Sequence, residues 1–282
     1  MENKEGEKDM SGWPQHVRSA LNQLGYEYPG DELYIEAFAG RWGGLDVANF
    51  AQALHEGQGE DVLLAIFAIG YMDTPFAHEQ LVPFLQSSQP KERWASAFCL
   101  GKMRDERALP ILISMLTEFL PPHVQYIAED HLEWFYEDWR PVIADLLGEW
   151  GRPALAPAFV EALKELWRQE QTVSEQNAIF VHSWYVSQNR LVYALGRLGK
   201  FDVLAELEVP EARLCTWRVY MALGYLGAAI HYPDIFRLGL FNKPVLREQV
   251  AALLEQQYSL SAEERERYLK LYSKEEDLHR GL

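Results

Sequence analysis

The chain has 282 residues, 48% of them hydrophobic, and a formal net charge of −16 at pH 7. The apolar share is that of a folded protein, which argues against wholesale disorder. An acidic surface repels nucleic-acid phosphates and anionic lipid, so we expect no nucleic acid and no membrane as partner. A basic protein or peptide fits the charge better.

The two cysteines, Cys99 and Cys215, lie far apart in sequence and within apolar helical patterns. We interpret them as buried thiols in a reducing compartment rather than as a disulfide. The first residues, Met1–Asp9, are highly charged and do not resemble a secretory signal. Because no uncharged apolar run approaches the ~18 residues of a membrane span, we expect a cytoplasmic protein.

The amino-terminal region differs from the rest of the chain. Residues 1–10 are expected to form a disordered acidic tail, and residues 11–60 a helical cap. Helical patterns lie around residues 14–24, 31–40 and 45–56. They are separated by Tyr28-Pro29-Gly30 and Trp42-Gly43-Gly44, which are typical turn sequences.

Residues 61–276 carry a repeated motif, in which an apolar helix ends in Leu-Gly or Ile-Gly. The positions one, two and four residues before each glycine are apolar or aromatic in every copy, which places a stripe on one helix face. A sixth, degenerate copy has Glu255 in place of the glycine. The pattern predicts about six helix pairs, whose marker glycines are Gly70, Gly101, Gly148, Gly196 and Gly224.

Each marker glycine ends the first helix of a pair. We expect it to allow close approach of the next helix and to adopt the left-handed conformation that closes a helix. After the second marker, Asp105 is predicted to cap the second helix. Pro110 then suits the first turn of that helix, as Pro157 and Pro233 do in other copies.

The spacing between markers is uneven and predicts insertions near 119–137 and 167–187, each an extra or an extended helix. Such elaborations of a solenoid often carry the binding surface. Near the carboxyl end, Ser261-Ala-Glu-Glu264 is a capping box for a last helix with a polar face. Residues 277–282 are expected to form a tail.

The clearest copy runs from Lys91 to Leu116 and reads KERWASAFCLGKMRDERALPILISML. It resembles the HEAT-like repeat of phycobilisome-lyase-type and related bacterial proteins. The resemblance extends loosely over residues 61–276. It implies an all-α fold, an α-solenoid of the HEAT/armadillo-like superhelix kind with about six helix pairs, but no activity. The matching residues are Ala97, Leu100, Gly101, Asp105, Arg107, Ala108, Leu109, Pro110 and Leu112.

The most unusual segment holds Glu129, Glu133 and Glu137, which on a helix would lie at i, i+4 and i+8 on one face. Carboxylates so placed repel one another unless something positive lies opposite. One interpretation is an acidic site for a basic peptide or a cation, with His131 and Asp138 nearby. The alternative is a solvated helix face whose aromatic residues pack inward.

Two enzyme-like or cofactor-handling alternatives concern the aromatic residues. Bilin lyases and related chaperones use HEAT-like solenoids, and Trp167, Trp184, Tyr185 and Trp217 could line a cofactor groove. Aromatic residues at helical spacing are more often core, and no nucleophile or acid–base pair accompanies these. HEAT-like DNA glycosylases place Trp and Asp around an extruded base, as at Trp134 to Trp139, but they need a basic surface.

The pairs His55-Glu56 and His78-Glu79 invite comparison with di-iron HEAT-repeat hydroxylases. They lie out of register with the repeat, so surface polar residues explain them better. We therefore predict no metal and no cofactor. The function that the sequence favours is a non-catalytic scaffold that binds a basic protein or peptide on the concave face of the solenoid. A bilin-lyase-like or other cofactor-handling protein is the alternative.

Overall fold

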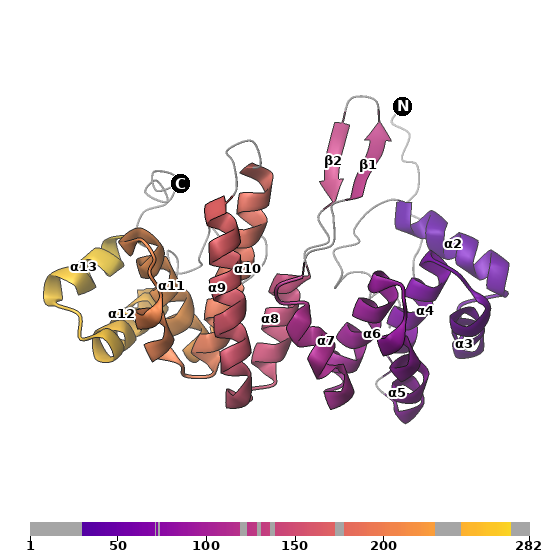
Figure 1. Ribbon diagram of the computed structural model, residues 1–282, viewed down its shortest axis with the longest axis horizontal. Helices are drawn as coiled ribbons and strands as arrows, with labels where there is room; N and C mark the ends of the chain where they lie inside the picture. Colours follow the sequence, from indigo (N-terminus) through magenta and orange to yellow (C-terminus); the bar gives the residue numbers. More distant parts are fainter. Residues whose placement is uncertain are drawn as a thin grey trace, which may run out of the picture. The chain divides into compact units, whose positions relative to one another are not determined.

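The computed structural model describes residues 30–70, 72, 74–118, 123–128, 131–135, 139–172, 178–228 and 244–271. For residues 30–35, 60, 123–128, 131–135, 172, 178–184, 206 and 269–271 the description covers the backbone alone. Figure 1 shows a chain built from consecutive short helices, with one two-stranded hairpin. The chain divides into two compact units, Met1–Leu112 and Ile113–Leu282. The tails expected at residues 1–10 and 277–282 lie outside the described residues.

The first unit is made of helices joined by short turns. The helices at 31–40 and 45–56 were predicted, and both are present, as α2 and α3. The helix predicted at 14–24 lies outside the described residues. The elements are α2 Gly30–Trp42, α3 Val47–Glu56, α4 Glu60–Gly70, α5 Pro75–Leu81, η2 Val82–Gln86, α6 Pro90–Lys102, η3 Glu106–Ala108 and α7 Leu109–Ser114, which ends in the second unit.

The second unit begins with the hairpin and continues with longer helices. The insertion predicted near 167–187 is an extension of two helices, α9 and α10, on either side of residues 173–177. The elements are β1 His123–Ala128, β2 His131–Phe135, α8 Arg140–Glu149, η4 Pro153–Leu155, α9 Ala156–Thr172, α10 Ala178–Arg197, η6 Phe201–Glu206, α11 Glu211–Tyr225, α12 Pro244–Tyr258 and α13 Ala262–Leu271.

The apolar stripe of the repeat forms the core of both units. Every position of the stripe is buried, which confirms the predicted register and the helix-pair architecture of an α-solenoid. The stripe residues are Ile66, Ala68, Ile69, Ala97, Cys99, Leu100, Ala144, Leu146, Leu147, Val192, Ala194, Leu195, Tyr220, Ala222, Leu223, Ala251, Leu253 and Leu254.

The marker glycines lie where first helices of successive pairs meet. A β-carbon on Gly70 would collide with Cys99 of α6, and one on Gly148 would lie 3.0 Å from the β-carbon of Ala194 in α10. A β-carbon on Gly196 would overlap the backbone of Met221 in α11. The predicted close approach is therefore confirmed at these markers, and the approaching element is the first helix of the next pair.

The left-handed conformation is not at the marker glycines, so this part of the prediction was wrong. It lies three residues later, at Gly151, Gly199 and Gly227, and in the second copy at Arg104, whose φ is 57°. There the amide of Arg104 donates to the carbonyl of Gly101 at 3.0 Å, and the next amide reaches the carbonyl of Leu100 at 2.9 Å. This paired arrangement is a Schellman ending, which places the left-handed residue just beyond the helix.

The insertion near 119–137 contains strands where we expected a helix. β1 and β2 pair antiparallel, with Val124 opposite Trp134 and Gln125 opposite Glu133. The interpretation of a helical acidic face was therefore wrong. Both strand sequences, HVQYIA and HLEWF, are rich in β-branched and aromatic residues, which favour a pleated chain over a helix.

The predicted caps are present. The Asp105 side chain accepts a hydrogen bond from the Arg107 amide at 3.0 Å, although it caps the 3₁₀ turn η3 that leads into α7. Pro110 and Pro157 lie in the first turns of α7 and α9, while Pro233 lies outside the described residues. Ser261 and Glu264 form the reciprocal capping box before α13, at 2.8 and 3.2 Å.

Candidate interaction surfaces

The acidic residues proposed from the sequence fall in and around the hairpin. Glu133 and His131 are in β2, where the description covers the backbone. Glu129, Glu137 and Asp138 lie outside the described residues, and Trp184 lies in the backbone-only part of α10. These residues therefore stay candidate binding residues, of which His131 and Glu133 lie in β2.

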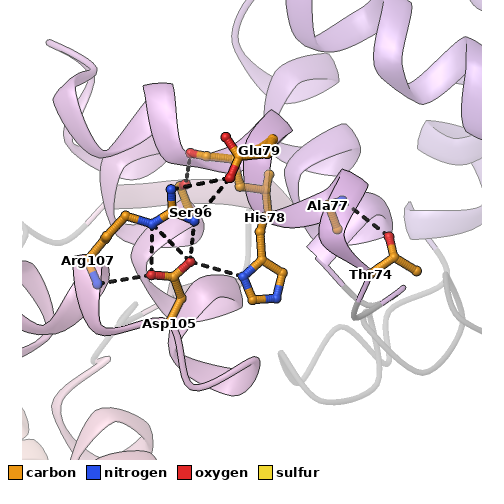
Figure 2. Close-up of polar contacts among 8 residues, drawn as sticks. Thr74, Ala77, His78, Glu79, Ser96, Asp105 and Arg107 are labelled. Atoms are coloured by element: carbon orange, nitrogen blue, oxygen red, sulfur yellow. Dashed lines mark hydrogen bonds and ion pairs between the residues drawn. The ribbon is translucent and has the colours of Figure 1, made fainter.

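A polar cluster joins two successive helix pairs in the first unit (Figure 2). Arg107 donates to both carboxylate oxygens of Asp105, through Nη2 at 2.6 Å and Nε at 3.0 Å. His78 of α5 places Nδ1 3.0 Å from the same carboxylate. The Arg107 guanidinium also lies 3.4 Å from Glu79 of α5. Asp105 thus connects the second helix of one pair to the turn of the next.

The electrostatics of this cluster favour an ionised Asp105. The hydrogen bonds from Arg107 are the main cause that lowers the pKa of Asp105 to about 2, and the bond from His78 acts in the same direction. Since the carboxylate can only accept, the His78 Nδ1 donates to it. The Asp105 side chain is 7% exposed whereas Glu79 is 72% exposed. The cluster therefore has one buried carboxylate, that of Asp105, and one exposed carboxylate, that of Glu79.

The two histidines that suggested a metal have separate partners. His55 Nε2 lies 3.1 Å from Gln80 Oε1, and His78 bonds to Asp105. Within the described part of the chain, no three His, Cys, Asp or Glu side chains gather in a group that could hold a metal ion.

The aromatic residues of the second unit include core residues. Trp217 of α11 is fully buried, and its ring packs edge-on against Trp167 of α9 with centroids 6.0 Å apart. Trp217 therefore belongs to the core and does not line an open cofactor groove. Trp167 and Tyr185 are partly exposed, and the guanidinium of Arg213 lies over both rings, 5.4 and 4.8 Å from their centroids.

An ion pair joins α8 to α10, between the partly exposed Asp145 and the buried Arg190. Arg190, 7% exposed, donates to Asp145 Oδ2 at 3.1 Å, while the other carboxylate oxygen of Asp145 is buried without a hydrogen bond. Burial is the main cause that raises the pKa of Asp145 to about 6, against the pull of Arg190. Two turns of α10 away from this pair, Arg197 lies 3.7 Å from Glu149.

Sequence reasoning missed the polar middle of α10. Ser187, Gln188, Asn189 and Arg190 are consecutive, and none is more than 6% exposed. Successive helical residues point in different directions, so the helix is enclosed on all sides at this level. The run of polar residues inside an apolar helical pattern was the signal that could have found it.

No helix within the described residues is long and apolar enough to cross a membrane.

In comparison with known families, residues 47–133 match the family model of HEAT repeats. No curated protein matches the chain. Over residues 47–133 the chain is therefore similar to HEAT repeats. The match begins at α3 and extends into β2.

Proposed function

From its HEAT-like repeats, we propose that the chain is a non-catalytic scaffold that binds a basic protein or peptide. HEAT repeats form helical scaffolds that often mediate protein interactions. The finer parts of the proposal are the basic character of the partner, the concave face as the binding surface and a cytoplasmic location. The net charge of −16 supports a basic partner, because complementary charge speeds encounter and disfavours acidic competitors.

The observation that carries the proposal is the hairpin. Among the described residues, β1 and β2 are the strand pair in an otherwise helical chain. The segment that contains the hairpin is also rich in carboxylates: Glu129, Asp130, Glu133, Glu137 and Asp138. An elaboration that breaks a repeat pattern is a common place for a binding surface.

A charge-reversal experiment tests this proposal. The triple variant Glu129→Lys, Glu133→Lys and Glu137→Lys is compared with the wild type in affinity purification from extracts of the source cell. The control triple, Glu36→Lys, Glu106→Lys and Glu161→Lys, changes the net charge equally at exposed positions elsewhere. Co-purifying polypeptides are identified by mass spectrometry, and binding is repeated at raised salt.

We expect the wild type and the control to retain a basic polypeptide that the hairpin variant loses. Raised salt should weaken this binding, because exposed charges are screened. Equal loss in both triple variants would point to the global charge rather than to the hairpin. Retention of the same polypeptides by all three proteins would remove the hairpin from the proposal.

A further inference from the structure

Three helices of the second unit surround the guanidinium of Arg213. Arg213 lies in the first turns of α11, and its Nη2 donates to Glu170 Oε1 of α9 at 2.7 Å. Its Nη1 donates to Gln188 Oε1 of α10 at 2.8 Å and lies 3.3 Å from the other oxygen of Glu170. We call the groups around this guanidinium the arginine cage: Trp167, Glu170, Tyr185 and Gln188.

The cage has the chemistry that recognises a guanidinium rather than an ammonium group. The two carboxylate oxygens and an amide oxygen face a planar fork of N–H donors, and two aromatic rings supply negative π-faces. Cation–π contacts of this kind favour Arg over Lys because the guanidinium is planar and more weakly hydrated. The buried ring of Trp217 packs edge-on against Trp167 and helps to hold it in place.

The acceptors of the cage have a support that does not depend on Arg213. The Gln188 side chain is fully buried, and its Nε2 donates to Glu170 Oε2 at 2.7 Å. This bond fixes the Gln188 amide so that its oxygen faces the guanidinium, and it holds Glu170 at the same time. The cage can therefore keep its shape when the guanidinium leaves.

The cage also has an open side. The side chains of Arg213 and Glu170 are 18% and 10% exposed, so solvent reaches both members of the ion pair. Arg213 is tethered to the same chain and fills the cage at a high effective concentration. An incoming arginine must compete with it, which restricts entry to a partner that gains contacts elsewhere.

We propose that the cage is an arginine-recognition site, which Arg213 keeps filled and into which an arginine of a basic partner exchanges. This proposal rests on the scaffold function proposed above, because it names the side chain by which such a partner is recognised. It makes Arg213 an internal competitor, so that only a partner with further contacts on the protein opens the site.

The first experiment needs no partner. Arg213→Ala empties the cage, and its melting temperature is measured with guanidinium chloride far below denaturing concentrations, with urea as the neutral control. A preformed cage binds guanidinium and raises the melting temperature of the variant but not that of the wild type. Equal responses to guanidinium and urea would show that no cage remains. In the double variant Arg213→Ala with Glu170→Gln, guanidinium should no longer raise the melting temperature.

The second experiment measures a short arginine-rich peptide and its lysine counterpart by calorimetry. Arg213→Ala should bind the arginine peptide at least about tenfold more tightly than the wild type. In the wild type Arg213 fills the cage in most molecules, whereas in the variant the cage is empty and open to the peptide. The lysine peptide should gain nothing. Equal gains in affinity for the two peptides, or no gain for either, would overturn the proposed exchange of arginines. The stabilisation of Arg213→Ala by guanidinium is a separate result and would not be changed by this outcome.

If Arg213→Ala does not fold, the wild-type protein supplies the test. The Nε resonance of Arg213, followed by NMR, should shift when the arginine peptide is added and stay in place with the lysine peptide. An arginine peptide that binds without moving this resonance would show that Arg213 is a structural ion pair only. Binding of an unrelated basic partner at the hairpin would leave this result unaffected, so the two proposals fail separately.

Discussion

Gly196 of α10 lies so close to Met221 of α11 that a β-carbon on the glycine would overlap the Met221 backbone. On the opposite side of the same contact, a β-carbon on Gly224 would overlap the carbonyl oxygen of Tyr193. The two helices therefore pack backbone to backbone, and glycine is required on both. This reciprocal arrangement explains why the Leu-Gly motif recurs in consecutive copies.

Gly196→Ala should destabilise the protein strongly. The new methyl group meets the main chain, which cannot rotate away as a side chain can, so we expect a loss of about 3 kcal/mol. Gly148→Ala should cost less, about 1 kcal/mol, because its β-carbon would lie 3.0 Å from the Ala194 side chain. Urea unfolding followed by circular dichroism measures both.

Gly40→Ala is the matched control, since Gly40 lies within α2 and, among the described residues, no atom lies within 4 Å of its would-be β-carbon. Alanine there should stabilise by up to about 1 kcal/mol through helix propensity. A similar loss for Gly40→Ala and Gly196→Ala would contradict the packing explanation.

Arg104→Gly should stabilise the first unit. Arg104 has a φ of 57° in the Schellman ending where the later copies have glycine, and a non-glycine residue in this region costs roughly 1 kcal/mol. The reciprocal change, Gly151→Ala, should lose a similar amount, because the φ of Gly151 is 64°. Thermal unfolding compares the stability of the two variants, and a higher melting temperature for Gly151→Ala would contradict this explanation.

The repeat was predictable because it depends on short-range patterns. Ile69, Leu100 and their equivalents carry the helical period in the sequence, and close helix contacts leave glycine as the marker. The same sequence contains Gly151, Gly199 and Gly227 three residues after a marker, so the helix endings could also have been found. The left-handed residue was assigned to the marker instead.

The hairpin and the arginine cage were harder to predict. Glu129, Glu133 and Glu137 fit a helical period in the sequence, whereas Glu133 lies in a strand that pairs with β1. Tertiary contact of this kind overrides local periodicity. The cage joins Glu170, Gln188 and Arg213 from three helices, and nothing in the spacing of these residues indicates that they meet.

The stability contribution of Asp105 should vanish in strong acid. Its pKa is about 2 in the folded protein and 3.8 ordinarily, so the fold gains about 2 kcal/mol from its ionised form. A lowered pKa means that this gain is complete above pH 4 and disappears as the pH falls through 2. Unfolding of Asp105→Asn and wild type should therefore differ at pH 5 and converge near pH 2.

Asp145 should show the opposite dependence. Its pKa is raised to about 6 in the fold, so the ionised carboxylate opposes folding at neutral pH and the opposition fades as the pH falls from about 7 to 4. Wild type should gain stability relative to Asp145→Asn over this window. The measurement is urea unfolding of both proteins at several pH values, and a constant difference would show that Asp145 titrates normally in the fold.

The two cysteines offer one reporter for each compact unit. Cys99 lies in the first unit and Cys215 in the second, and both are 5% exposed. Burial raises the pKa of Cys99 to about 12 and also raises that of Cys215, so neither thiol should react with a maleimide in the native protein. Labelling followed by peptide mass spectrometry therefore reports local opening at each site.

With this readout, Gly70→Ala should speed labelling of Cys99, because its β-carbon would collide directly with that side chain. Cys215 should stay protected, since destabilisation of one unit leaves the opening of the other unchanged when units unfold separately. Gly196→Ala should give the reverse pattern. If either substitution exposes both thiols at the same rate, the two units unfold as a single cooperative body.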